Sequence, residues 1–177
     1  MTDRAGVITF KGNPLTLAGS QPKVGRKAPD FTVVGNDLAP VSLAQFAGKV
    51  VVISAVPSLD TATCNIETRR FDQEASTLGP AVVVLTVSMD LPFAQSRWCG
   101  AAGVHSVITA SDYREGQFGK KYGTLIKELR LLTRAIFVVG REGRLEYQQI
   151  VPEVSSEPNY DEVLNVVRAL LGDRKQN

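Results

Sequence analysis

Two short apolar runs rich in β-branched residues dominate the hydrophobic pattern of the chain. Residues 50–56 and 82–87 each contain a single hydroxyl residue among aliphatic ones, as is typical of strands buried on both faces of a parallel sheet. Between them, apolar residues recur at roughly helical spacing from Ile66 to Leu78, which predicts an amphipathic helix that ends near Gly79. These segments predict a βαβ unit with two parallel strands.

The N-terminal part of the pattern predicts smaller elements. Val7 to Phe10 and Leu15 to Leu17 flank a Gly-Asn-Pro turn, which predicts a β-hairpin as an extension over residues 1–20. Phe31 to Val34 is a further candidate strand. Ser42 is placed to cap a short helical piece that runs through Phe46 and stops at Gly48.

The C-terminal half predicts two more helices and a strand pair. Pro92 suits the first turn of a helix that runs to about Cys99 and stops at Gly100. Leu131 to Val139 and Leu145 to Ile150 are joined by a turn short enough to require an antiparallel pair.

The last predicted helix runs from Tyr160 to Leu171, with Asn159 as its cap and Gly172 as its stop. A βαβ unit followed by a hairpin and a helix predicts a central mixed sheet flanked by helices, which is a thioredoxin-like layout of the α/β class. We expect residues 1–177 to form a single domain.

Composition narrows the possible roles. The 177 residues carry 20 basic and 18 acidic side chains, and the basic ones are scattered, so a nucleic-acid partner is not expected. The first residues lack the long apolar stretch of a secretory signal, and no apolar run approaches the roughly 20 residues that span a bilayer. We therefore expect a soluble, cytoplasmic protein that does not enter a membrane.

Two cysteines, Cys64 and Cys99, are too few for a disulfide framework, which leaves buried thiols or redox chemistry. Cys64 follows the first apolar run through a Pro/Ser/Asp/Thr cluster and lies where a helix begins. A free thiol has a pKa of about 8.5, and helix N-termini and neighbouring cations bring such values to roughly 3.5 to 7.5. The position of Cys64 is therefore one where a reactive thiolate forms.

Three residues are candidates to shape that site. Thr61 precedes Cys64 by three positions, so its hydroxyl can cap the helix and reach toward the sulfur, and Pro57 stiffens the exit from the strand. Both residues also fit a purely structural role, because threonine and proline are common where a strand passes into a helix. Arg134 is a charge in an otherwise apolar strand, so it either faces a site or forms a salt bridge at the strand end.

Two segments resemble a known family. PSLDTATC, which ends at Cys64, resembles the peroxidatic-cysteine motif of peroxiredoxins. SMDLPFAQSRWC, which ends at Cys99, resembles the resolving-cysteine segment of the bacterial thiol peroxidase subgroup, which uses two cysteines of one subunit. The likeness covers nearly the whole chain.

The resemblance implies a function and roles for the candidates. Cys64 would be the peroxidatic nucleophile, Thr61 and Arg134 would bind the peroxide oxygens, Pro57 would screen the pocket, and Cys99 would resolve the oxidised Cys64 as an intramolecular disulfide. Hydrogen peroxide and organic hydroperoxides would be the substrates, without a metal or prosthetic group. A thioredoxin-type reductant would recycle a homodimeric enzyme.

Other functions remain open at this stage. A redox switch that senses peroxide and signals to a partner shares the first chemical step, and turnover distinguishes the two. His105 is the only histidine, so no histidine cluster exists for a metal, but it could serve as the base of a cysteine hydrolase. A disulfide carrier is disfavoured because residues 64–67 lack the second thiol of a Cys-x-x-Cys motif.

Overall fold

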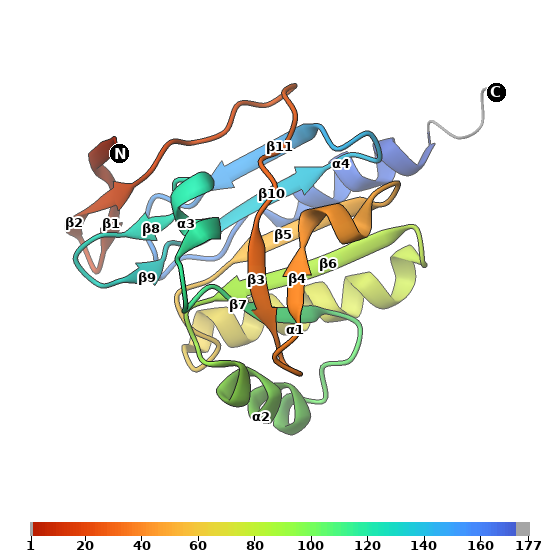
Figure 1. Ribbon diagram of the computed structural model, residues 1–177, viewed down its shortest axis with the longest axis horizontal. Coiled ribbons are helices and arrows are strands. Elements are labelled where there is room, and N and C mark those ends of the chain that lie inside the picture. The colour runs from red at the N-terminus through yellow and green to blue at the C-terminus, as the bar shows by residue number, and fades with distance from the viewer. Residues whose placement is uncertain (1, 173–177) are drawn as a thin grey trace.

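The computed structural model describes residues 2–172, which form two β-sheets with helices around the larger one (Figure 1). The larger sheet has seven strands. In their spatial order they are β11 (Leu145–Ile150), β10 (Ala135–Val139), β5 (Val50–Ala55), β6 (Val82–Ser88), β7 (Ile108–Ser111), β3 (Thr32–Gly35) and β4 (Pro40–Ser42).

The central βαβ unit is present as predicted. β5 and β6 pair in parallel, with Val50 opposite Val82, and α1 (Ala62–Leu78) connects them. Every residue of β5 is buried, which is why its sequence is continuously apolar rather than alternating. The predicted antiparallel pair is also present, because β10 and β11 run in opposite directions.

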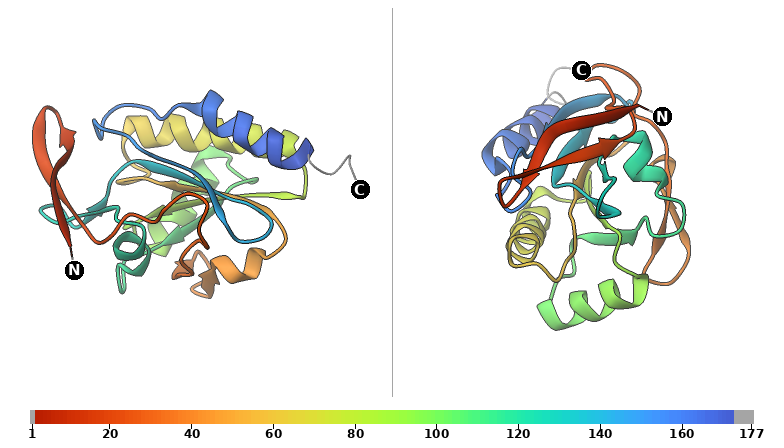
Figure 2. Two further views of the ribbon diagram at one scale, coloured as in Figure 1. Left: turned by 90° about the horizontal axis from the view of Figure 1, so that it is seen from above. Right: turned by 90° about the vertical axis from the view of Figure 1, so that its left-hand side faces the viewer.

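Helices cover both faces of this sheet (Figure 2). On one face, α1 and α4 (Tyr160–Gly172) lie side by side and pack through Phe71 and Val163 against Val50 and its neighbours. On the other face, the 3₁₀ helix η1 (Leu43–Phe46) and α3 (Gln117–Lys121) pack against Val51 and its neighbours. This arrangement confirms the predicted thioredoxin-like architecture.

The N-terminal hairpin is present but is more than an extension. It consists of β1 (Asp3–Phe10) and β2 (Asn13–Ala18), and β2 pairs with β8 (Leu125–Ile126), which pairs with β9 (Leu131–Leu132). The hairpin therefore belongs to a second, four-stranded sheet at one end of the molecule (Figure 2). A separate core of Ile8, Leu17, Ile126 and Val154 holds it there.

The predicted strand from Leu131 to Val139 is wrong in one respect, because it is two strands. β9 belongs to the small sheet and β10 to the large one, with Thr133 and Arg134 between them. A buried guanidinium needs polar partners that a packed strand face does not supply. The backbone accordingly leaves one sheet and enters the other at Arg134.

The predicted helix end at Gly100 is also wrong. The helix α2 runs from Pro92 to Ala102, and Gly103 ends it with φ +67° and an N–H donated to the carbonyl of Cys99. Glycine inside a helix costs only about 1 kcal/mol, whereas the left-handed C-cap strongly favours glycine. Cys99 therefore lies within the helix rather than at its end.

The N-caps predicted for α1 and α4 are present. Thr61 accepts a hydrogen bond from the Cys64 N–H at 3.2 Å, and Asn159 Oδ1 accepts one from the Glu162 N–H at 3.2 Å. α4 extends through Gly172, the last described residue. Within residues 2–172, no helix has the length and apolarity needed to cross a membrane.

Gly19, which follows β2, tests how tightly the small sheet is joined to the rest. A Cβ at Gly19 would lie 2.1 Å from the carbonyl oxygen of Lys120, whereas a Cβ at Gly25 would meet nothing within 4 Å. Both residues have positive φ, +95° and +81°. We predict that Gly25→Ala lowers the free energy of unfolding by about 1 kcal/mol through left-handed strain, and Gly19→Ala by about 2 kcal/mol more. Urea unfolding of the two variants measures the difference, and equal losses would contradict the close approach.

Candidate active site

Cys64 lies in the first turn of α1 and is fully buried. Its backbone N–H is capped by Thr61, so the helix begins immediately before the thiol. The positive end of the helix dipole and the free N–H groups of the first turn favour a negative charge there. The Cys64 side chain therefore lies at the positive end of α1.

Arg134 supplies the cation that the sequence could only suggest. Its side chain is 1% exposed, and its Nη2 donates to Cys64 Sγ at 3.2 Å. Its Nε donates to the carbonyl of Val154 at 3.0 Å, and its Nη1 forms an ion pair with Glu67. Both alternatives considered for Arg134 hold, since its side chain faces the Cys64 thiol and also pairs with the Glu67 carboxylate.

Glu67 is a residue that the sequence analysis missed. It is fully buried on α1, one helical turn after Cys64, and also accepts a hydrogen bond from Ser54 Oγ at 2.7 Å. Burial raises the pKa of Glu67, while the charge of Arg134 and the hydrogen bonds from Ser54 and Arg134 oppose that rise. The spacing of three residues from Cys64, which places both on one helix face, was the available signal.

The charge of Arg134 is firmly held. Burial alone lowers the pKa of Arg134, but the charges of Glu67 and Cys64 and their hydrogen bonds raise it overall. The guanidinium therefore stays charged, and its N–H donors are held in fixed positions beside Cys64.

An apolar pocket of about 400 Å³ adjoins this cluster. Pro57, Thr61 and Arg134 line it, together with Phe10, Lys11, Ser58, Ala62, Thr63, Ile126, Leu129, Leu131, Val154 and Ser155. The Thr61 oxygen accepts from Cys64, which leaves its hydroxyl proton free to donate. The structure thus brings four predicted residues together, namely Cys64, Thr61, Pro57 and Arg134.

Cys99 is not part of this cluster. Both cysteines are free thiols, and Cys99 Sγ lies 3.4 Å from the Thr109 hydroxyl on the side of a different pocket. Trp98, the residue before Cys99, packs instead against Val56, Leu59 and Cys64. Neighbouring helix residues point about 100° apart, so the helix that places the indole near Cys64 turns the Cys99 thiol away.

Asp90 is a second residue that the sequence did not reveal. Its carboxylate accepts hydrogen bonds from Ser58 Oγ at 2.7 Å and from the Leu59 N–H at 2.8 Å. Ser58 and Leu59 belong to the loop before Cys64, and Asp90 lies two residues before α2, which carries Cys99. The carboxylate therefore joins the two cysteine-bearing segments.

The hydrolase alternative loses its support. His105 is exposed and lines the pocket beside Cys99, and its backbone N–H is bound by Asp72. It does not line the pocket at Arg134. Cys64 has Arg134 as its side-chain partner instead of an imidazole.

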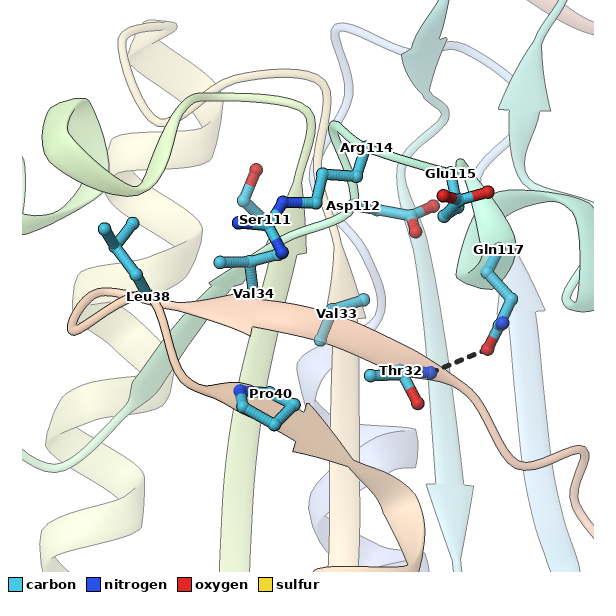
Figure 3. Close-up of a pocket in the computed structure, with 10 residues that line it drawn as sticks. All are labelled: Thr32, Val33, Val34, Leu38, Pro40, Ser111, Asp112, Arg114, Glu115 and Gln117. Carbon is cyan, nitrogen blue, oxygen red and sulfur yellow. Dashed lines mark hydrogen bonds between the residues drawn. The ribbon is translucent and has the colours of Figure 1, made fainter.

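A further pocket of about 320 Å³ lies between β3 and the segment 111–117 (Figure 3). Val33, Val34 and Pro40 line it, and the Thr32 N–H donates to Gln117 Oε1 at 2.7 Å. None of the predicted site residues line it. Among the described residues, no group of three or more His, Cys, Asp or Glu side chains is placed to hold a metal ion.

A thiol at a helix start, bonded to a buried arginine beside an apolar pocket, defines a thiol-based redox centre on a thioredoxin-like fold. Comparison with known proteins specifies this class further. The Redoxin family profile matches residues 23–164, and the chain belongs to that family.

Close relatives carry one name. The chain is 54% identical over 158 residues to the thiol peroxidase of Oceanobacillus iheyensis, covering 89% of this chain and 96% of that protein. It is 51% identical over 164 residues to the thiol peroxidase of Bacillus subtilis, covering 93% and 98%.

Solved structures agree with the fold. The crystal structure of a peroxiredoxin-like protein from Aquifex aeolicus superposes with a TM-score of 0.87 at 44% identity, covering 94% of this chain and 98% of that one. The predicted resemblance to peroxiredoxins and thiol peroxidases is confirmed.

The ion pair of Glu67 and Arg134 yields a stability prediction. Glu67→Gln should lower the free energy of unfolding by about 3 kcal/mol or more, because it leaves a buried guanidinium without its carboxylate. Glu74→Gln is the matched control, since Glu74 pairs with Arg70 on the same helix with the arginine side chain 43% exposed, and it should cost less than about 0.5 kcal/mol. Urea unfolding compares them, and similar losses would contradict the structural role of the buried pair.

Proposed function

We propose that this chain is a thiol peroxidase that reduces hydrogen peroxide and organic hydroperoxides through Cys64, with no metal or prosthetic group. The observation that carries the proposal is the contact between Cys64 Sγ and Arg134 Nη2 at 3.2 Å, with Arg134 lining an apolar pocket. The names of the relatives support the same activity.

In the first step, the Cys64 thiolate attacks one oxygen of the peroxide. A sulfur–oxygen bond forms, the O–O bond breaks, and the departing oxygen takes a proton and leaves as an alcohol or as water. The product on the protein is a sulfenic acid. Arg134 and the Thr61 hydroxyl would donate to the peroxide oxygens as negative charge moves onto the leaving one, which would stabilise the transition state more than the ground state.

In the second step, the Cys99 sulfur attacks the Cys64 sulfenic acid, forms a disulfide and releases water. A disulfide requires Cα atoms within about 7 Å, yet Cys99 contacts Thr109 while Trp98 packs beside Cys64. We therefore expect the first turn of α1 or the end of α2 to unwind during each cycle. Hydrogen exchange that is identical in reduced and oxidised protein around both cysteines would contradict this.

A dithiol reductant of the thioredoxin type would then restore both thiols. Four parts of the proposal stay predictions. They are that reductant, a homodimeric assembly, a cytoplasmic location and the action of residues 1–177 as one domain. Pro57 would screen the pocket from solvent, since it is buried at the pocket wall.

The two cysteines should separate the two steps. Cys64→Ser should abolish peroxide consumption, because the nucleophile is removed. Cys99→Ser should allow one rapid reaction with peroxide and then stall with thioredoxin as reductant, because no disulfide forms. Intact mass after one equivalent of peroxide checks both, with loss of two hydrogens and a Cys64–Cys99 linkage in the wild type.

Multiple turnovers also exclude a stoichiometric peroxide switch, which would stop after one equivalent. A Cys64→Ser protein that still consumes peroxide would end the assignment.

Arg134 should govern the rate of the first step. Arg134→Lys keeps a positive charge but loses the planar fork that reaches Cys64, Glu67 and Val154 together. We predict a fall of about 100-fold in the rate of sulfenic acid formation and slower alkylation of Cys64 by iodoacetamide at pH 7. Arg70→Lys, an exposed cation on α1, is the control and should leave both rates unchanged; equal rates for the two variants would remove Arg134 from the mechanism.

A further inference from the structure

We propose that Glu153 is a positioning residue that sets selectivity for bulky hydroperoxides, by holding the tip of the N-terminal hairpin as one wall of the pocket. The inference rests on the proposed peroxidase activity and concerns which peroxides that activity favours. It assigns a role to a carboxylate that touches neither cysteine.

Glu153 is the central acceptor in the contact between the hairpin and the segment that follows β11. Its carboxylate accepts hydrogen bonds from Thr9 Oγ1 at 2.7 Å, from the Lys11 N–H at 2.9 Å and from the Gly12 N–H at 3.2 Å. The Ser155 hydroxyl donates to it at 2.6 Å. Charged acceptors make stronger hydrogen bonds than neutral ones, and these bonds lower the pKa of Glu153 below its usual range.

The geometry of the hairpin tip explains why such a clamp is needed. Lys11 has φ +50° and Gly12 φ +79°, so the turn contains a non-glycine residue in the left-handed region, where residues other than glycine are strained. The carboxylate bonds the N–H groups of both turn residues. It therefore stabilises the turn at the position where Phe10 and Lys11 line the pocket.

The same segment also fixes the chemical side of the pocket. The Val154 carbonyl accepts from Arg134 Nε at 3.0 Å, and the Ser155 carbonyl accepts from Thr63 Oγ1 at 3.1 Å. Residues 153–155 therefore hold both the hairpin wall of the pocket and the arginine. Arg134 keeps Glu67 as a partner independent of Glu153, so the wall can loosen while the guanidinium stays in place.

The rate of reaction with a peroxide should depend on the hairpin wall to a degree set by the size of the peroxide. Hydrogen peroxide has two heavy atoms and needs only the donors near Cys64. A hydroperoxide with an aromatic substituent extends into the pocket of about 400 Å³ and contacts its apolar wall. A lost apolar contact in such a pocket changes the specificity constant by about tenfold or more.

The test compares two peroxides on the full-length protein with dithiothreitol as reductant. Glu153→Ala should lower kcat/KM for cumene hydroperoxide about tenfold through KM and leave that for hydrogen peroxide within about twofold. Phe10→Ala should reproduce this pattern. The double variant should lose no more than Phe10→Ala alone, because both changes remove the same wall.

Glu128→Ala is the matched control. Glu128 accepts from the Thr16 N–H on the other strand of the hairpin with both oxygens at 3.0 Å, but it does not line the pocket. Both specificity constants should stay within about twofold of wild type. Amide hydrogen exchange supplies a readout independent of activity, and the Lys11 and Gly12 amides should exchange faster in Glu153→Ala than in Glu128→Ala.

Each other outcome overturns the inference. An equal fall for both peroxides would mean that Glu153 acts on Arg134 or on the fold, and unchanged values for both would mean that the wall does not select. Unchanged exchange of the Lys11 and Gly12 amides would show that Glu153 does not hold the turn. A wild-type protein that consumes neither peroxide would instead refute the proposed function, and so the two failures are distinguishable.

Discussion

The burial of one guanidinium organises the active site. Arg134 reaches Cys64 only because its charge is taken out of water and compensated by Glu67, the Val154 carbonyl and the thiol itself. A buried charge without such partners would be strongly destabilising. The break between β9 and β10, the buried Glu67 on α1 and the position of the segment after β11 all satisfy this one requirement.

The parts of the site that sequence predicted are those defined by local chemistry. Thr61 and Cys64 are separated by a cap spacing, and Pro57 ends the preceding strand, so their proximity follows from a strand-to-helix transition. Arg134 was visible because charge is unusual in an apolar run. Glu67 lay on the same helix face as Cys64, but its partner is 67 positions away along the chain.

Glu153 and Asp90 lay beyond prediction for the same physical reason. Each carboxylate accepts hydrogen bonds from backbone N–H groups and hydroxyls of a distant segment, residues 9–12 for Glu153 and the Ser58–Leu59 pair for Asp90. Backbone donors carry no residue-specific signal. The fold shows the same limit, since the apolar runs at 50–56 and 82–87 were predicted correctly while β4, β7, β8 and α3, each of five residues or fewer, were missed.

The packing of Trp98 gives the molecule an internal optical probe. Its indole is the only one in the chain, and it lies against the Cys64 cluster while its neighbour is the second thiol. Any rearrangement that joins the two sulfurs must change the polarity and contacts around that ring. The emission of the unlabelled protein should therefore report its redox state in real time.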